Sequence, residues 1–214
     1  ALRTYERMER SQHAESLTET TLELPPRAVT SPYFGFTYTV LVPLLLFLPV
    51  FIGGSITVDS LTEEIDRGTL ELLRVAPVTM TQIVEGKLLA AAGLAPLQAA
   101  LWMLLLGVNG TPVSNIPALI ALTAGAAMIV VVLGAGIALL APDRRAAQTI
   151  YSLGVLGVFG LAALTPVNPA NLAARLAIGS ADPLAYVAVG GVIAVGVVAV
   201  SAARTVVPRY AMVE

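Results

Sequence analysis

The chain has 214 residues, of which 57 % are hydrophobic and only 12 % are charged. Soluble domains carry about 25 % charged residues, so this composition indicates an integral membrane protein. The formal net charge of −2 gives no basic signal for nucleic acid, and the absence of cysteine excludes disulfides, iron–sulfur clusters and thiol catalysis. The single histidine, His13, lies in a polar segment, where a solvated side chain is a commoner role than a metal ligand.

Residues 1–30 have the composition of a polar arm. Residues 1–27 hold four arginines and five glutamates, and they are too few to build a core of their own. We expect a solvated arm with a helix that breaks at Pro25 and Pro26. No signal peptide is in view, and a start at Ala1 rather than at methionine suggests that part of the gene product lies upstream.

Five stretches after this arm are apolar and long enough to cross a bilayer, which takes about 20 residues. The first begins with an aromatic belt at Tyr33, and we expect Pro43 and Pro49 to kink it. The predicted spans are residues 33–58, 87–106, 118–141, 146–164 and 184–203.

Two of the connections between these spans have a distinct character. Residues 107–117 have the composition of a turn. Residues 165–182 are semi-apolar but too short to cross a bilayer, which favours a short interfacial or re-entrant helix closed by Gly179.

Glycines recur in the last two predicted spans. Small residues let helices approach closely, so we expect these glycines to pack within one bundle, with a dimer seam as the alternative. They are Gly154, Gly157, Gly160, Gly190, Gly191 and Gly196.

Most of the charge beyond the arm lies in residues 59–87, between two long uncharged runs. Ser60 and Glu63 fit a capping box that starts a helix, and Glu63 can pair with Arg67 four residues on. Gly68 interrupts that helix and predicts a bend or a fresh helix start at this position. The periodicity fits both a helix that lies in the membrane interface and a helix that docks on a soluble partner, because both need one apolar and one charged face.

The distribution of basic residues predicts the orientation in the membrane, because cytoplasmic loops carry an excess of lysine and arginine. Seven basic residues lie in the connections and the tail on one side of the membrane, whereas the short connections on the other side carry only Arg175. We therefore expect the stretch 59–87 and the C-terminus to be cytoplasmic and the polar arm to be external, which suggests a sixth span upstream. The basic residues on the cytoplasmic side are Arg67, Arg74, Lys87, Arg144, Arg145, Arg204 and Arg209.

No predicted span has an ionisable residue in its interior. This argues against a proton-coupled carrier and against an intramembrane aspartyl protease, which needs two buried carboxylates. A serine–histidine protease would need a membrane histidine. Gly86-Lys87 is not a phosphate-binding loop, since the earlier glycine of that motif is missing and Leu88 follows. We predict no catalytic residue and no metal site on this chain, and an energy source supplied by a partner.

A group of residues within 64–87 resembles the signature of ABC transporter permeases of the type 2 (ABC-2) family. In that family an acidic residue, a G-T-L-E motif, a Pro-Val and a Gly-Lys form a cytoplasmic coupling segment that rests on the ATP-binding subunit. The resemblance covers the chain from about residue 33 to the C-terminus. The matching residues are Glu64, Arg67-Gly68-Thr69-Leu70-Glu71, Leu73, Ala76-Pro77-Val78 and Gly86-Lys87.

The resemblance implies an all-α integral membrane protein with five transmembrane helices visible, six with the upstream span, a cytoplasmic coupling helix and a short external re-entrant helix. The expected domains are an external arm over residues 1–30, a transmembrane permease domain over 31–207 with its coupling segment at 59–87, and a cytoplasmic tail over 208–214.

The implied function is that of the membrane-spanning subunit of an ATP-driven exporter in the cell membrane. ATP and magnesium would bind to a separate ATP-binding subunit and no cofactor to this chain, and a second permease chain, identical or different, would complete the transporter. The alternatives are a non-transporting membrane scaffold that uses the same helix, and an ATP-independent carrier. The predicted contact residues for the ATP-binding subunit are Glu64, Arg67, Gly68, Thr69, Glu71, Pro77, Gly86 and Lys87.

Overall fold

The computed structural model describes residues 32–67, 80–165 and 167–210. The chain divides between residues 31 and 32 into two units, and the described residues all belong to the second. The predictions for the arm of residues 1–30 and for the helix bend at Gly68 lie outside the described residues.

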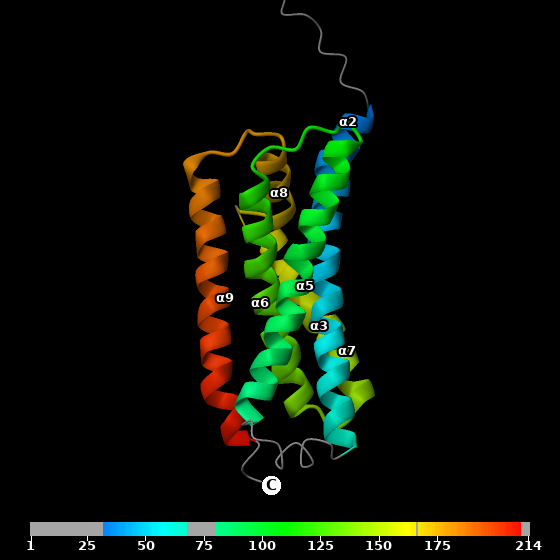
Figure 1. Ribbon diagram of the computed structural model, residues 1–214, viewed down its shortest axis with the longest axis vertical. Coiled ribbons are helices and arrows are strands. Elements are labelled where there is room, and N and C mark those ends of the chain that lie inside the picture. Colours follow the sequence, from blue (N-terminus) through cyan, green and yellow to red (C-terminus); the bar gives the residue numbers. More distant parts are fainter. Residues whose placement is uncertain (1–31, 68–79, 166, 211–214) are drawn as a thin grey trace, which may run out of the picture. The chain divides into compact units, whose positions relative to one another are not determined.

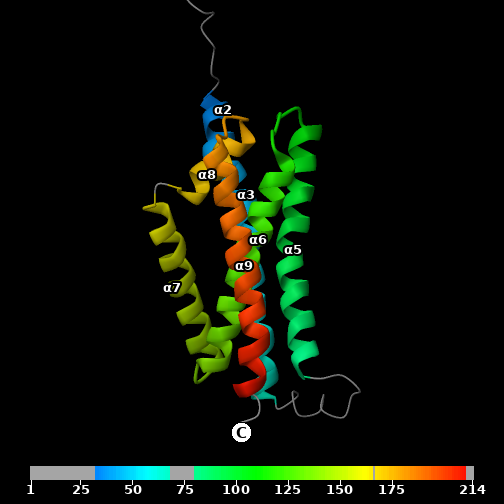
Figure 2. The same ribbon diagram turned by 90° about the vertical axis from the view of Figure 1, so that its left-hand side faces the viewer.

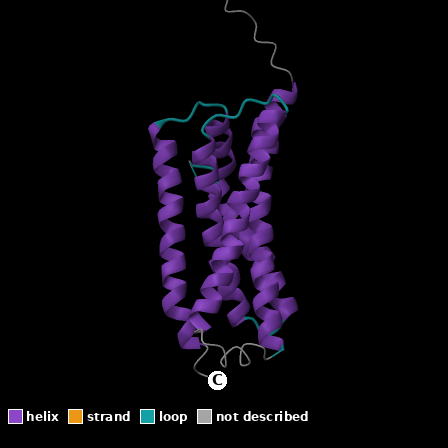
Figure 3. Ribbon diagram, viewed as in Figure 1, coloured by secondary structure: helices purple, strands orange, loops and turns teal. Residues whose placement is uncertain are grey.

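All regular structure in these ranges is helical (Figure 3). Five long helices lie side by side (Figure 1), and the apolar part of each is long enough to cross a membrane. The prediction of an all-α membrane protein with five visible spans is therefore confirmed. The helices are α3 (Val42–Asp66), α5 (Met80–Val108), α6 (Ile116–Leu140), α7 (Arg144–Ala163) and α9 (Pro183–Tyr210).

Two short elements continue α3 in the N-terminal direction, namely α2 (Pro32–Phe36) and the π-helix η1 (Thr37–Leu41). The buried Tyr38 of η1 donates its hydroxyl hydrogen to the carbonyl of Pro112, which ties the first span to the connection between α5 and α6. Pro43 follows directly at the start of α3. Prolines and π turns are both common sites of helix distortion, and η1 ends at Leu41, two residues before Pro43. Pro49, the second expected kink, lies inside α3.

Helices α3 and α5 extend past the predicted spans into the charged stretch. Helix α3 ends at Asp66 and runs through Ser60 without a new start, so the predicted capping box is wrong. Leu61 and Thr62 are only 3 % and 4 % exposed at this point. The helix therefore does not start at Ser60 despite the capping signal there. Packing against the bundle stabilises a helix more than local propensity does, so α3 continues through this position. Helix α5 begins at Met80 and runs through Lys87 into the second span.

Helix α6 is the central element, since it contacts α3, α5, α7, α8 and α9. Figure 2 shows α5 and α7 on opposite sides of it. A Cβ atom at Gly134 would lie 2.9 Å from the backbone oxygen of Gly54, and one at Gly196 would lie 2.8 Å from that of Gly125. Helices α3 and α9 therefore pack against α6 almost backbone to backbone, as small residues permit.

The glycines singled out in the last two spans divide into two groups. Gly196 packs within the bundle as predicted, and Gly154 makes an ordinary contact with Ile137. The prediction of packing within the bundle is wrong for the other glycines, because a Cβ atom added there would meet nothing within 4 Å. These are Gly157, Gly160, Gly190 and Gly191.

The expected short helix between the last two spans is α8 (Pro169–Ala177). It begins at Asn168, whose side-chain oxygen accepts hydrogen bonds from the backbone of the first turn. Gly179 lies two residues beyond its last residue and has a positive φ of 78°. The Gly179 amide donates to the Leu176 carbonyl and the Ser180 amide donates to the Arg175 carbonyl. These contacts are those of a Schellman motif, so the predicted closure by Gly179 is confirmed.

Candidate functional site: the charged end of the bundle

The predicted contact residues fall into two groups. Gly68, Thr69, Glu71 and Pro77 lie outside the described residues. Glu64, Arg67, Gly86 and Lys87 are described, and they lie together where α3 ends and α5 begins. We call this region the charged end of the bundle, and it comprises Asp59, Glu63, Glu64, Arg67, Glu85, Lys87, Arg144 and Arg204.

Lys87 joins α5 to α3. Its ammonium group donates to the carboxylate of Glu64 and, over 3.0 Å, to the hydroxyl oxygen of Ser60. The Lys87 and Glu64 side chains are 31 % and 23 % exposed, so this pair is better shielded from solvent than the other ion pairs of the charged end. The structure thus brings two predicted site residues together that are 23 positions apart in the sequence.

Two further ion pairs connect helices at the same end. Arg144 of α7 lies 2.9 Å from Asp59 of α3, and Arg204 of α9 lies 3.4 Å from Glu85 of α5. Together with the Glu64–Lys87 pair, they link α7 to α3, α3 to α5, and α5 to α9. The charged end therefore joins the four helices that surround α6.

Arg67 differs from these residues, because its partner is on its own helix. It lies 2.7 Å from Glu63, as the spacing of four residues predicts, and its side chain is 70 % exposed. The neighbouring Asp66 is exposed as well. Arg67 and Asp66 therefore present exposed charge at the end of α3.

Four of the eight residues of the charged end have no contact predicted from the sequence, namely Asp59, Glu85, Arg144 and Arg204. A signal for them existed, because each lies where an apolar run meets a charged segment, and the two members of each pair carry opposite charges. The predicted set was limited to residues that match the family signature, and these four stand outside it.

The described residues contain no group of three or more side chains of the metal-binding types placed to hold an ion. Each ion pair of the charged end matches one carboxylate with one basic group. Such an arrangement can hold helices together and present charge to a partner.

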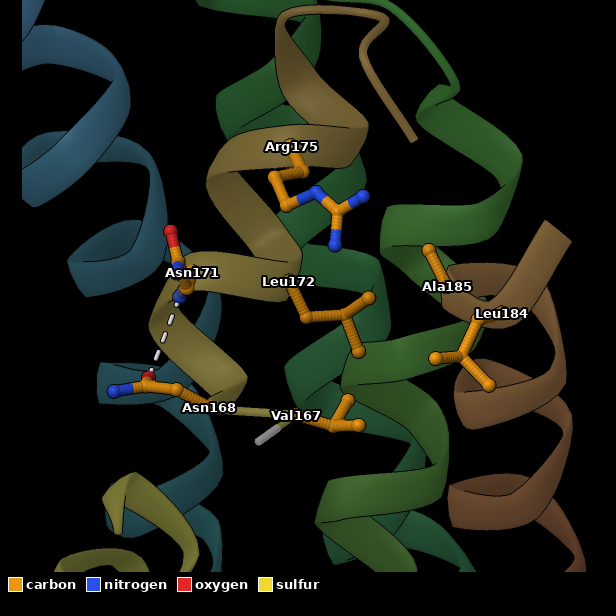
Figure 4. A pocket seen from close by; sticks show the side chains of 7 residues that line it. All are labelled: Val167, Asn168, Asn171, Leu172, Arg175, Leu184 and Ala185. Atoms are coloured by element: carbon orange, nitrogen blue, oxygen red, sulfur yellow. Dashed lines mark hydrogen bonds between the residues drawn. The ribbon is translucent and has the colours of Figure 1, made fainter. Parts of the chain in front are cut away.

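A small pocket lies beside α8, away from the charged end (Figure 4). Its volume is about 40 Å³, which has room for water, whereas small-molecule sites occupy about 300–1,000 Å³. Arg175 lines it and pairs with Asp182 at 3.1 Å. The pocket is lined by Val167, Asn168, Asn171, Leu172, Arg175, Leu184 and Ala185.

The comparisons with known proteins agree with this architecture. A family model described as "ABC-2 family transporter protein" matches residues 2–193 of the chain. No curated protein and no solved structure shows significant similarity to it.

Proposed function

The chain belongs to the ABC-2 family of transporter proteins and is a multi-pass membrane component of such a transporter, and on that premise we propose that it couples ATP hydrolysis on a separate ATP-binding subunit to the export of a substrate. The observation that carries the proposal is the charged end. There α3 and α5 converge, and ion pairs connect them to α7 and α9.

The segment 68–79 joins the end of α3 to the start of α5 along the chain. A partner that moves this segment pulls on both helices at the point where Glu64 and Lys87 connect them. The Asp59–Arg144 and Glu85–Arg204 pairs pass the movement on to α7 and α9. Packed helices with two discrete arrangements respond to such a force by switching between states, and these states would be the inward- and outward-facing forms of the transporter.

The proposed contact surface for the ATP-binding subunit contains exposed charge at its edge. Arg67 is the most exposed ion-paired residue of the charged end. The signature residues that follow it within the next ten positions are Gly68, Thr69, Glu71 and Pro77. Gly86 is also exposed, one position before Lys87. Exposed charges at an interface steer the partner and fix its register, and they add specificity more than affinity.

Basic residues support a cytoplasmic location for the charged end. Lys87, Arg144 and Arg204 take part in its ion pairs, and Arg145 follows Arg144, whereas Arg175 lies on α8. The excess of basic residues marks the cytoplasmic side. We place the C-terminus on that side too, since α9 runs from the α8 connection back to Arg204.

The complete transporter would contain two permease chains and two ATP-binding subunits, with ATP and magnesium bound only to the latter. The two permease chains can be identical or different. The spans lack fixed charge in their interiors, which is compatible with lipids, hydrophobic drugs or ions as the exported substrate.

The test is affinity purification of the tagged chain from its native membranes, followed by an assay for ATPase activity in the eluate. The variants Arg67→Glu and Glu71→Arg reverse charges at the proposed surface, and Asn171→Glu, which adds a charge at an exposed position of α8, is the matched control. We expect an ATPase to accompany the parent and the control and to be reduced in both surface variants, while all four proteins unfold at similar temperatures.

Two results would contradict the proposal. If no ATPase accompanies the parent, the result favours the scaffold alternative. In that alternative the same helix binds a soluble partner of another kind. If transport in vesicles persists after ATP is depleted, the chain acts as an independent carrier. An ATPase that accompanies both surface variants at the parent level would move the contact away from Arg67 and Glu71.

A further inference from the structure

A groove lies between α3 and α5, next to the charged end, and no step of the proposed mechanism uses it. Its volume is about 290 Å³. Two of its large apolar residues, Ile56 and Leu94, are 48 % and 45 % exposed, and Ala90 is exposed as well, so the groove opens to the outside of the bundle. It is lined by Ile56, Thr57, Ser60 and Leu61 from α3 and by Lys87, Ala90, Ala91 and Leu94 from α5.

One end of the groove is polar and rich in hydrogen-bond donors. A lysine ammonium carries three N–H donors, and Lys87 gives two of them to Glu64 and Ser60. The Ser60 oxygen accepts from Lys87, so the hydroxyl hydrogen of Ser60 still points elsewhere. One N–H of Lys87 and the O–H of Ser60 can therefore donate to a further acceptor.

The rest of the groove is apolar and runs along the spans. From Lys87 to Leu94 the groove extends along α5 by about 10 Å, at about 1.5 Å per residue. Lys87 opens the apolar run of α5, whereas Ala90, Ala91 and Leu94 lie progressively deeper within it. The polar end thus falls at the membrane interface and the apolar wall in the hydrocarbon region. An occupant must be an amphiphile with an acceptor-rich head.

We propose that this groove binds a glycerophospholipid with an anionic headgroup, taken from the leaflet that surrounds the charged end. The phosphate oxygens accept hydrogen bonds from Lys87 and Ser60, and the first part of an acyl chain lies against Ile56, Ala90 and Leu94. Basic pockets between transmembrane helices bind anionic headgroups in this way.

Glu64 sets the affinity of this site. Its carboxylate occupies one side of the Lys87 ammonium, so it competes with the phosphate for the same cation and repels the negative headgroup. Removing the charge of Glu64 therefore strengthens lipid binding, whereas removing the charge of Lys87 weakens it. These opposite signs distinguish a headgroup site from general contact with the bilayer.

The experiment is native mass spectrometry of the purified full chain during titration with phosphatidylglycerol or phosphatidylcholine. We expect one phosphatidylglycerol to bind at lower concentration than phosphatidylcholine. Lys87→Met should weaken phosphatidylglycerol binding about tenfold or more, because a hydrogen bond to a charged group is lost. Glu64→Gln should tighten it.

A second pair of variants tests the apolar wall without touching a charge. Ala90→Leu places a larger side chain at an exposed position of the groove and should displace the lipid, whereas Ala163→Leu, at an exposed position at the end of α7, should not. Both residues are exposed, so the fold is kept in each case.

The proposal is overturned if phosphatidylcholine and phosphatidylglycerol bind equally, if Ala90→Leu and Ala163→Leu behave alike, or if Glu64→Gln weakens binding. Should Lys87→Met fail to fold, the Ala90 and Glu64 variants still decide the question. None of these results bears on the partner ATPase, so the lipid site and the proposed function fail independently.

Discussion

The guanidinium of Arg144 lies 2.9 Å from the carboxylate of Asp59, although 85 residues separate them. This ion pair is the outermost of a row of polar contacts between α7 and α3. Gln148 exchanges hydrogen bonds of 3.2 and 3.3 Å with Ser55, and the Tyr151 hydroxyl donates to a backbone carbonyl of α3. Helix α7 buries only Ala147, Tyr151 and Val155, and these polar contacts add to the packing of Phe159 against Phe47 and Phe51 of α3.

The first prediction concerns the Asp59–Arg144 pair itself. A double-mutant cycle with Asp59→Asn and Arg144→Gln should give only a weak coupling between the two side chains, because both are about half exposed. The measurement is unfolding of the purified protein in detergent at low salt and at high salt. The coupling should shrink as salt rises.

The control for this cycle is Arg145→Gln. Arg145 is exposed and forms no ion pair with any described residue, so its replacement should leave stability unchanged. A coupling between Asp59 and Arg144 that is unchanged at high salt would mean that the pair is shielded from water, contrary to its exposure.

The second prediction concerns the hydroxyl of Tyr151, which lies 2.6 Å from the carbonyl oxygen of Phe51 in α3. Tyr151→Phe should lower the free energy of unfolding by about 0.5–1.5 kcal/mol, because one intramolecular hydrogen bond is lost. Ser152→Ala is the control, since the Ser152 hydroxyl bonds only within its own helix and is exposed. Equal effects of the two changes would show that the hydroxyl contributes nothing to the attachment of α7.

The spans could be predicted from the sequence, because a run of about 20 apolar residues identifies a transmembrane helix without reference to its neighbours. The closure of α8 at Gly179 could be predicted for a similar reason, since a Schellman motif is local. The helix start predicted at Ser60 is also a local inference, and it is wrong. Leu61 and Thr62 are buried against the bundle, and that burial has no local signature.

Part of the charged end could not be predicted for a different reason. The charges of Glu64 and Lys87 are evident in the sequence, but their pairing depends on α3 and α5 converging side by side. The same holds for glycines. Gly134 and Gly136 are equivalent by sequence, yet only Gly134 faces α3, because the close approach depends on how α6 is rotated in the bundle.

The third prediction follows from this difference between the two glycines. Gly134→Ala should destabilise the protein by about 1–3 kcal/mol, because the new methyl group would lie 2.9 Å from a backbone oxygen of α3 that cannot move away easily. Gly136→Ala, which meets nothing within 4 Å, should be neutral or stabilising by up to about 1 kcal/mol. Thermal unfolding of both variants in the same detergent measures which of them is less stable. A Gly136→Ala variant less stable than Gly134→Ala would contradict the packing of α6 on α3.

The fourth prediction concerns pH. The guanidinium of Arg175, followed by the hydrogen bond from the Ala185 amide, lowers the pKa of the Asp182 carboxyl below its ordinary value of 3.8. A carboxyl whose pKa is lower in the folded state stabilises that state above the unfolded pKa, and the stabilisation is lost as pH falls through the folded pKa. The difference in melting temperature between the parent and Arg175→Gln should therefore be constant from pH 7 to about pH 5 and should narrow below pH 3.8.

The control for the pH series is Asp182→Asn, which removes the titrating group. The difference in melting temperature between Asp182→Asn and the double variant Asp182→Asn/Arg175→Gln should not change over the same acidic range. If the difference in melting temperature between the parent and Arg175→Gln stays unchanged below pH 3, then Arg175 acts through packing rather than through the charge of Asp182.

The last prediction concerns Asn115, which has a positive φ of 50°, the only such value at a non-glycine residue among those described. Its amide group donates to the Leu176 carbonyl of α8 at 3.0 Å and accepts from the Tyr186 hydroxyl of α9 at 2.9 Å. The neighbouring Ser114 amide donates to the Ala177 carbonyl of α8 at 2.8 Å. One residue at the start of α6 therefore holds α8 and α9 in place, and its side chain is used across helices instead of capping its own.

Three substitutions separate the conformational role of Asn115 from its hydrogen bonds. Asn115→Gly keeps the left-handed conformation and loses both side-chain bonds, Asn115→Asp keeps the acceptor for Tyr186, and Asn115→Ala loses the bonds and strains the backbone. Hydrogen exchange of the Ser114 amide should be fastest in the alanine variant and intermediate in the glycine variant, because each step frees more of the contact with α8. Asn171→Ala, at an exposed position on α8, is the control, and its Ser114 amide should exchange at the same rate as in the parent. If the glycine variant also exchanges at the parent rate, then backbone conformation alone anchors α8, and the two side-chain bonds are incidental.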